Sequence, residues 1–263
     1  MALISMCVYS TEENEKDECL DRTLKSLCKT VNFQRHRLIL SVNGHTSKTS
    51  EMIMGGNFTL GHVIFNETNL GTAEGINRIW QYRNPGEHVI KMDDDVVINH
   101  FGWADIMEDA LNRDKSIGQI GLKRKDLIES PWHPDPFYKS KIQMLPHDPG
   151  QRWIVVEEAS HIMGTCVMHS SDLIDTVGYL YQMPGNKYGF DDSLMSLRSK
   201  LAGFRNCFLP TIDIDHIDNG GTPFQKWKES NAASRWSEYH KTVAGFKNGT
   251  IPLYYNPFKK SND

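Results

Sequence analysis

Three consecutive aspartates, Asp93, Asp94 and Asp95, directly follow the apolar run "HVIKM". Like charges this close repel one another and burial strengthens the repulsion, so we expect a cation beside them. If the segment is extended, Asp93 and Asp95 share one side and Asp94 faces away. Such a pair suits a hard divalent cation, Mg²⁺ or Mn²⁺, with coordination positions left open for a diphosphate. A solvated acidic turn is the alternative, and the apolar run before it favours the metal.

Two more groups of residues could act beside such a cation. Asp191 and Asp192 follow "KYGF" at the expected start of a helix. There they either cap the N-terminus of the helix, where carboxylates interact favourably with the helix dipole, or serve as a general base beside an aromatic wall. His216 lies among acidic residues in "DIDHIDNGG", on what we expect to be a flexible, polar edge of a site. It is either a structural or exposed histidine or a metal ligand, and an imidazole ligand would favour Mn²⁺ over Ca²⁺.

The first half of the chain alternates strand-like and helix-like patterns. The predicted elements are strands at 2–10, 36–44, 61–68 and 88–92, and helices at 20–31 and 69–84, the second with Thr72 as its N-cap. This alternation predicts a mostly parallel sheet with helices on both faces. Ligands bind such sheets beyond the carboxyl ends of the strands, where residues 10–12, Asn43, Asn69 and the three aspartates lie.

The second half is less regular. The predicted elements are helices at 101–114 and 191–201, strands at 117–122 and 154–170, loops at 129–153 and 181–190, and a short helix capped by Ser171 or Asp172 and ending near Gly178. The segment from Thr222 includes the aromatic residues Trp227, Trp236, Tyr239 and Phe246. We expect it to be either a helix that packs on the domain or a mobile flap.

The composition is that of a globular protein. The chain has 263 residues, 39% of them hydrophobic, and a net charge of −4, which gives no strongly basic surface for nucleic acid. Its five cysteines lack C-x-x-C spacing, which favours a reducing compartment over disulfides or zinc. No apolar stretch reaches the ~20 residues of a membrane span. The first residues lack the charged flank of a signal peptide, so we expect a cytoplasmic protein.

Five segments in chain order resemble the motifs of glycosyltransferase family 2, which has the GT-A fold. They are "VYSTEENEKDECLDRTLKSL", "NLGTAEGIN", "KMDDDV", "GTCVMHSSDLIDTVGYL" and "YGFDDSLMSLRSKLAGF", and "HID" resembles a late metal-binding histidine of the superfamily. The resemblance implies a mixed, mostly parallel, Rossmann-like α/β sheet flanked by helices. It divides the chain into a catalytic domain at 1–221, with a nucleotide-sugar half at 1–99 and an acceptor half at 100–221, and an extension at 222–263.

The resemblance also implies a reaction. A sugar would pass from a nucleoside diphosphate donor, by default a UDP-sugar, to an acceptor hydroxyl, with Mn²⁺ or Mg²⁺ as cofactor. The acceptor would be a glycan or another hydroxyl-bearing molecule, and the negative net charge disfavours nucleic acid. Inversion at the sugar would need a general base but no enzyme nucleophile.

Individual residues take their expected roles from the same resemblance. The metal would be held by Asp95, His216 and Asp93, and Asp192, or else Asp191, would be the base. The nucleotide sugar would be lined by Tyr9, Ser10, Glu12, Asn43, Asn69, Gly71, Asn77, Asp93 and Asp94. The candidates for the acceptor side are Trp132, Trp153 and Tyr188, for which simple loop packing is the alternative. Asn43 stands where the family often has aspartate, and Asp191 where it has glutamate.

Two other classes share parts of this pattern. A nucleotidyltransferase that makes nucleotide sugars has a related sheet, but it carries a Gly-rich phosphate loop after its first strand. Here that stretch, "VYSTEENEKDE", is acidic and has no glycine. A non-catalytic carbohydrate-binding relative would have lost the metal and base positions, whereas Asp95, Asp192 and His216 are all present.

Overall fold

A computed structural model describes residues 1–14, 16–56, 58–128, 141–218 and 223–259. Its strands are β1 (Ala2–Tyr9), β2 (Arg37–Gly44), β3 (His62–Phe65), β4 (His88–Met92), β5 (Val96–Val97), β6 (Ile117–Arg124), β7 (Ile142–Met144), β8 (Val155–Glu158), β9 (Cys166–His169) and β10 (Arg205–His216). Its helices are α1 (Asp17–Thr30), α2 (Ser47–Met54), α3 (Thr72–Trp80), α4 (Trp103–Arg113), α5 (Lys125–Ile128), α6 (Ser171–Val177), α7 (Asp191–Leu201), α8 (Pro223–Ser234) and α9 (Trp236–Asn248).

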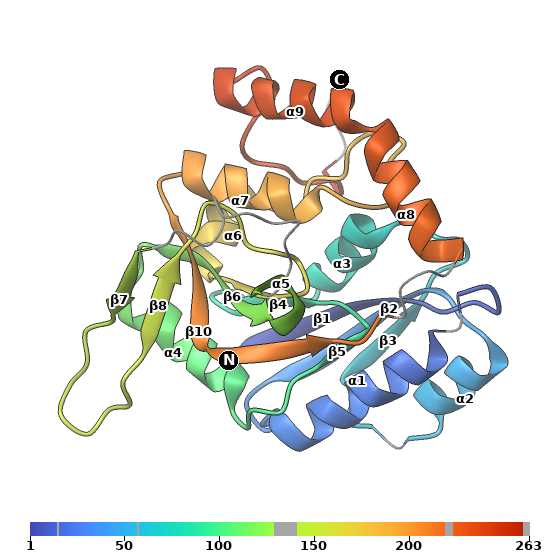
Figure 1. Cartoon of the computed structure of the whole chain (residues 1–263), viewed down its shortest axis with the longest axis horizontal. Coiled ribbons are helices and arrows are strands. Elements are labelled where there is room, and N and C mark those ends of the chain that lie inside the picture. Colours follow the sequence, from blue (N-terminus) through green and yellow to red (C-terminus); the bar gives the residue numbers. More distant parts are fainter. Residues whose placement is uncertain (15, 57, 129–140, 219–222, 260–263) are drawn as a thin grey trace.

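The strands form one mixed sheet in the order β3-β2-β1-β4-β9-β6-β10-β8-β7, and β5 pairs with β10 (Figure 1). Strands β1 to β4 are mutually parallel, as are β6 and β10. Because β9 is antiparallel to both β4 and β6, these two groups run in the same direction. The predicted mixed, mostly parallel sheet is therefore confirmed, and the carboxyl ends of its main strands lie at one edge.

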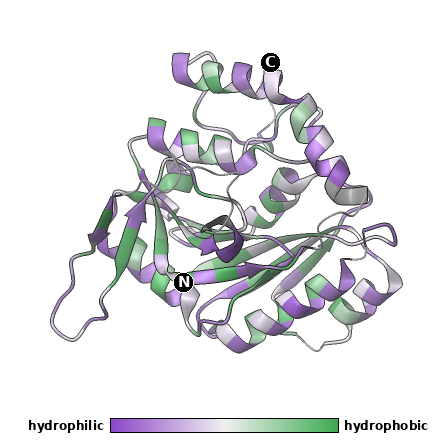
Figure 2. Ribbon diagram, viewed as in Figure 1, coloured by the Kyte–Doolittle hydropathy of each residue, from purple (hydrophilic) through white to green (hydrophobic). Residues whose placement is uncertain are grey.

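Helices cover both faces of this sheet (Figure 1). Helices α1 and α4 bury Leu24, Trp103 and Met107 against one face, where the largest apolar cluster lies. Helices α3 and α6 bury Trp80 and Leu173 on the opposite face. Figure 2 shows hydrophobic residues concentrated in the central strands, and purple, hydrophilic residues on the outer sides of the helices. Apolar residues at helical spacing in α1 and at successive positions in the strands produce this layering.

Some local predictions differ from the structure. No element is predicted between residues 45 and 60, yet α2 lies there, capped by the hydroxyl of Thr46, which accepts from Thr49 N. This helix buries only two of its eight residues, so it leaves a weak periodic signal. Helix α3 begins at Thr72 itself, with Gly71 as the N-cap. Strand β7 lies within the predicted loop 129–153 and pairs with β8.

The C-terminal segment contains the two helices α8 and α9. Helix α9 packs Phe246 against Leu194 of α7. The guanidinium of Arg198, also in α7, is fully buried and donates to the carbonyls of Tyr179 and Leu253 at 2.7 Å and 2.7–2.9 Å. A buried guanidinium needs such acceptors, so these bonds tie the chain after α9 to the domain. In the described part of the chain, no helix is long and apolar enough to cross a membrane.

Candidate active site

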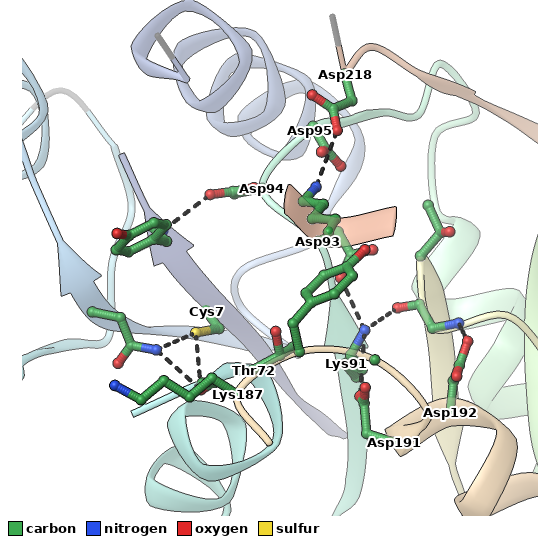
Figure 3. Close-up of a pocket in the computed structure, with 18 of the residues that line it drawn as sticks. Cys7, Thr72, Lys91, Asp93, Asp94, Asp95, Lys187, Asp191, Asp192 and Asp218 are labelled. Carbon is green, nitrogen blue, oxygen red and sulfur yellow. Dashed lines mark hydrogen bonds and ion pairs between the residues drawn. The ribbon is translucent and has the colours of Figure 1, made fainter. Parts of the chain in front are cut away.

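A cavity of about 290 Å³ lies at the carboxyl edge of the sheet (Figure 3). Its walls come from the ends of β1, β2, β4 and β10, from the start of α7 and from α8. This is the edge at which a ligand is expected in a sheet of this kind. The described residues that line it are Cys7, Tyr9, Lys16, Asn43, Asn69, Gly71, Thr72, Lys91, Asp93, Asp94, Asp95, Arg124, Met163, Gly164, Thr165, Lys187, Tyr188, Gly189, Asp191, Asp192, His216, Asp218, Trp227 and Lys228.

One end of the cavity holds a cluster of three possible metal ligands, Asp95, His216 and Asp218. One ligand atom from each lies within 4.8 Å of the others. Antiparallel pairing of Val96 with His216 brings the two chain segments together, and Ile217 N donates to Asp95 O at 2.8 Å. His216 is therefore the last residue of a strand, and not part of the flexible edge that was expected.

Asp95 has an oxygen available for a cation. The residue is only 3% exposed. Its Oδ1 has no hydrogen-bond partner among the described residues and lies 3.4 Å from His216 Nε2. A buried oxygen without a partner is costly, and carboxylate oxygens with an imidazole nitrogen suit Mn²⁺. The residues present therefore fit a divalent cation.

Lys16 supplies a positive charge at the same place. Its Nζ contacts Asp95 Oδ2 and lies 3.1 Å from Asp218 Oδ1. Burial alone would lower the pKa of Lys16, but Asp94, Asp95 and Asp218 hold it above its usual value. Burial would likewise raise the pKa of Asp95, but His216 and Lys16 hold it below the usual range. The carboxylate of Asp95 is thus ionised and able to bind a cation.

The other two aspartates of the triplet face different partners. The segment is a turn, and Asp94 accepts from Tyr9 N at 3.3 Å. Burial and repulsion from Asp95 raise the pKa of Asp94 to about 6, although Lys16 opposes the shift. Asp93 accepts from Lys91 Nζ at 2.9 Å. Asp93 and Asp95 therefore do not lie on one shared side, as the extended segment predicted. Asp218, rather than Asp93, lies in the metal-ligand cluster with Asp95.

Asp191 and Asp192 lie at the start of α7, on the wall next to Lys91 (Figure 3). The Oδ2 atom of Asp191 is buried without a hydrogen-bond partner among the described residues, and it lies 3.9 Å from Lys91 Nζ. Burial and repulsion from Asp192 raise the pKa of Asp191 to about 6, although Lys91 opposes the shift. A proton is therefore held more tightly by Asp191 than by an ordinary aspartate.

Asp192 is the more accessible carboxylate, with a side chain 26% exposed against 10% for Asp191. Its Oδ2 accepts from Gly164 N at 3.1 Å and lies 3.6 Å from His161 Nε2. Burial would raise the pKa of Asp192, but His161, Lys91 and the Gly164 N–H hold it below its usual range. Asp192 is therefore fixed in position and ionised at neutral pH.

The opposite wall is built around Gly71. Asn43 Nδ2 donates to Gly71 O at 3.0 Å, and Asn69 Oδ1 accepts from Gly71 N at 2.9 Å. Gly71 has a φ of 89°, and a Cβ there would lie 2.6 Å from Lys187 O. Only glycine allows this approach of the 181–190 loop to the start of α3. Both asparagines and Gly71 thus line the cavity, with the Asn43 amide already engaged by the backbone.

Other predicted residues lie away from the cavity. Ser10 is buried and donates to Asp17, Glu12 is exposed, and Asn77 is buried and pairs with the backbone of Leu180. Trp153 is exposed and packs on His147 near β8, whereas Tyr188 lines the cavity. Trp132 lies outside the described residues. The chain turns at residues 12–14, where Asn14 N donates to Thr11 O at 3.2 Å, and Ser10 is held by its bond to Asp17, so neither Ser10 nor Glu12 lines the cavity.

Several cavity residues have no counterpart in the predictions. They are the cations Lys16, Lys91, Arg124, Lys187 and Lys228, together with Asp218 and Trp227. Lys91 could have been identified from the sequence, because a lysine inside the apolar run "HVIKM" requires a partner when it is buried. Lys228 and Trp227 come from α8, and Lys228 Nζ lies 3.1 Å from Asp218 Oδ2. Helix α8 therefore contributes directly to the wall of the cavity.

No family model and no curated protein matches this chain. Solved structures do match its fold. GalNAc-T7 with UDP, GalNAc and Mn²⁺ has a TM-score of 0.58 at 15% identity, over 96% of this chain and 52% of that one. The mannosyltransferase PcManGT from Pyrobaculum calidifontis, in complex with GDP-Man and Mn²⁺, has a TM-score of 0.59 at 12% identity, over 96% and 76%.

A third structure, S. aureus TarS 1-349 in complex with UDP-GlcNAc, has a TM-score of 0.59 at 15% identity. The match covers 84% of this chain and 61% of that one. This chain thus spans about half of the length of GalNAc-T7 and about three fifths of TarS 1-349. The fold that it shares with these transferases is the GT-A fold that the sequence resemblance implied. At these identities the likeness establishes the fold.

The raised pKa of Asp191 predicts a pH-dependent cost to stability. A carboxyl group whose folded-state pKa of about 6 exceeds its usual value of 3.8 destabilises the fold as pH rises through that interval. We therefore compare the unfolding free energy of Asp191→Asn with that of the parent protein at each pH. The difference, variant minus parent, should be about 1–2 kcal/mol larger at pH 8 than at pH 4.5. Urea unfolding at the two pH values measures this difference.

Asp192→Asn is the matched control for this experiment. Because the pKa of Asp192 is lowered, its ionised form stabilises the fold above pH 3.8, and this stability is lost only in stronger acid. The variant should lose stability at both pH values. Its gain at pH 8 relative to pH 4.5 should be smaller than that of Asp191→Asn, because it removes only the Asp192 repulsion that helps to raise the pKa of Asp191. An effect of Asp191→Asn that is the same at both pH values would show that the pKa of Asp191 is not raised.

Proposed function

We propose that the protein is a divalent-metal-dependent glycosyltransferase that uses a nucleoside diphosphate sugar. The observation that carries the proposal is the cluster of Asp95, His216 and Asp218, in one cavity with the carboxylate pair of Asp191 and Asp192. The cluster provides hard oxygen and imidazole ligands, and the pair provides a proton acceptor. Both lie at the ligand-binding edge of a fold shared with structures that hold UDP or GDP-Man together with Mn²⁺.

The balance of charges in the cavity supports a donor that binds together with a divalent cation. Six carboxylates line the cavity against five lysine and arginine side chains, so the described residues alone offer little net attraction to a diphosphate. A divalent cation at the Asp95 cluster would reverse this balance. When bound, it would supply Lewis-acid stabilisation of the charge that grows on the departing diphosphate. Lys187 and Arg124 also line the cavity and would supply further positive charge for the phosphate oxygens.

The donor would lie between the Gly71 wall and the aspartate turn. Tyr9, Asn43 and Asn69 line this side and would contact the nucleoside. Uridine is the proposed base by resemblance, although the Asn43 amide is engaged by Gly71 and leaves the recognition of the base to neighbouring groups. Asp93 is held by Lys91 at the centre of the cavity and would face the sugar or ribose.

Asp192 is the proposed general base. Both aspartates line the cavity, and the side chain of Asp192 is more exposed than that of Asp191. A general base must first be able to reach the acceptor hydroxyl, so accessibility favours Asp192 over the greater proton affinity of Asp191. Gly164 N holds its Oδ2, which fixes the direction in which it can accept a proton. The acceptor hydroxyl would lose its proton to Asp192 as its oxygen attacks the sugar carbon from the side opposite the diphosphate. Such a displacement inverts the configuration at that carbon.

A thermal-shift screen tests the metal and donor together. We expect nucleotide sugars, with UDP-sugars and GDP-mannose in the panel, to raise the melting temperature only when Mn²⁺ is present, because the ligand binds the native state. Asp95→Asn should abolish the shift by removing the central ligand. The same variant is compared in metal-free buffer to show that it is folded.

Asp215→Asn is the matched control for this screen. It removes a carboxylate next to His216 in β10, but Asp215 lies outside the cavity lining and pairs with Lys125 at 2.8 Å. The variant should retain the full Mn²⁺-dependent shift. A shift that needs no divalent cation, or that survives in Asp95→Asn, would contradict the proposed site. A shift with nucleoside triphosphate and sugar phosphate instead of nucleotide sugar would indicate a nucleotidyltransferase.

Hydrolysis of the donor, with water as acceptor, tests the base. Asp192→Asn should lower turnover by about 10²–10⁴-fold while the Mn²⁺-dependent shift with donor is retained. With Asp192 as base, turnover at saturating donor should not decline from pH 8 to pH 5, because its pKa is lowered. A decline of about tenfold per pH unit below pH 6, with full activity in Asp192→Asn, would assign the base to Asp191 instead.

A further inference from the structure

Lys16 lies against two of the carboxylates that would bind a metal ion. Its side chain is 5% exposed, and its Nζ contacts Asp95 and lies 3.1 Å from Asp218, two of the three residues in the proposed cation cluster. Figure 3 shows the carboxylates of Asp95 and Asp218 next to each other above Asp93. The ammonium group is thus a cation bound by the same carboxylates that a divalent ion would bind.

The position of Lys16 is fixed by the fold. Lys16 is the N-cap of α1, and its carbonyl accepts from Leu20 N at 3.0 Å. The same helix is tied to the aspartate turn, because Thr23 Oγ1 donates to Asp94 O at 3.1 Å and accepts from Val96 N at 3.0 Å. Helix α1 therefore holds the lysine against Asp95, and the contact follows from how the two elements pack.

Lys16 pairs with only some of the carboxylate oxygens of the cluster. Asp95 Oδ1 is buried and has no hydrogen-bond partner among the residues described, while Oδ2 is engaged by Lys16. Asp218 is engaged by Lys16 at one oxygen and by Lys228 at the other. A monovalent ammonium can offset the repulsion between these carboxylates without the ion, but its charge would oppose a divalent cation a few ångströms away.

We propose that Lys16 is an internal counter-cation that competes with the divalent ion for Asp95 and Asp218, and that it turns to the donor's diphosphate when the ion binds. This inference rests on the proposed function. Lys16 lines the cavity in which the diphosphate would lie, so its ammonium can exchange carboxylate for phosphate oxygens without leaving the site. This exchange makes the metal and the nucleoside diphosphate bind cooperatively. The divalent ion displaces the Lys16 ammonium from the carboxylates, and the diphosphate binds the displaced ammonium, so each ligand makes binding of the other more favourable.

Calorimetric titration with MnCl₂ tests this competition without measuring activity. Lys16→Met removes the charge and keeps a side chain of similar length. It should bind Mn²⁺ about 5- to 150-fold more tightly than the parent protein, the range of ordinary energetic coupling between sites. Adding UDP should tighten Mn²⁺ binding more in the parent than in Lys16→Met, because only the parent has this ammonium to transfer.

Lys25→Met is the matched control, because Lys25 lies in the helix that Lys16 caps but forms an exposed pair with Asp21. Its Mn²⁺ affinity should equal that of the parent. Lys16→Gln is the second variant, to be used if Lys16→Met does not fold, because glutamine keeps a hydrogen-bond donor for Asp95 without the charge. Circular dichroism in metal-free buffer identifies a variant that has lost the fold.

The outcomes separate this inference from the proposed function. Unchanged or weaker Mn²⁺ binding in both folded Lys16 variants, with binding by the parent that Asp95→Asn removes, would overturn the competition and leave the metal site in place. An equal effect of UDP on the parent and on Lys16→Met would overturn the transfer to the diphosphate. If neither the parent nor any Lys16 variant binds Mn²⁺ with UDP present, the proposed metal site fails and this inference fails with it.

Discussion

The site depends on the concentration of carboxylates at one edge of the sheet. Asp94 and Asp95 are buried beside each other at the end of β4, and Asp218 is brought to them by the pairing of β5 with β10. Such a group is stable only when positive charge lies among it. Lys16 and Lys228 provide that charge in the protein itself, and they balance the carboxylates without satisfying every oxygen.

A second carboxylate group at the start of α7 is organised in the same way. Lys91 lies in the buried strand β4, and its Nζ donates to Asp93 and to the carbonyl of Gly164 at 2.9 Å and 2.7 Å, close to Asp191. It thereby lies between the aspartate turn and Asp191, the neighbour of the proposed base. Lys16 and Lys91 are thus buried lysines in the two halves of the cavity, and each has at least one partner from a distant part of the chain. Helix α8 completes the wall with Trp227 and Lys228.

The sheet and the residues that follow its strands could be predicted from the sequence, because those signals are local. Alternating apolar patterns indicated the layers, and Asn43, Asn69 and Asp95 were placed at the ligand-binding edge, where all three line the cavity. Asp218 and Lys16 could not be assigned, because their roles depend on a two-residue strand and on the packing of α1 against the turn. Ser10 was expected in the cavity because it ends an apolar run, but a hydrogen bond to Asp17 holds it away.

The central claim is that Asp95 Oδ1 and His216 Nε2 bind one divalent cation. Anomalous diffraction from a crystal soaked with Mn²⁺ and UDP tests it most directly. The account predicts a manganese peak roughly 2–2.4 Å from both atoms, with a diphosphate oxygen completing the coordination. A complex in which UDP is bound in the cavity and no manganese lies between Asp95 and His216 would contradict it.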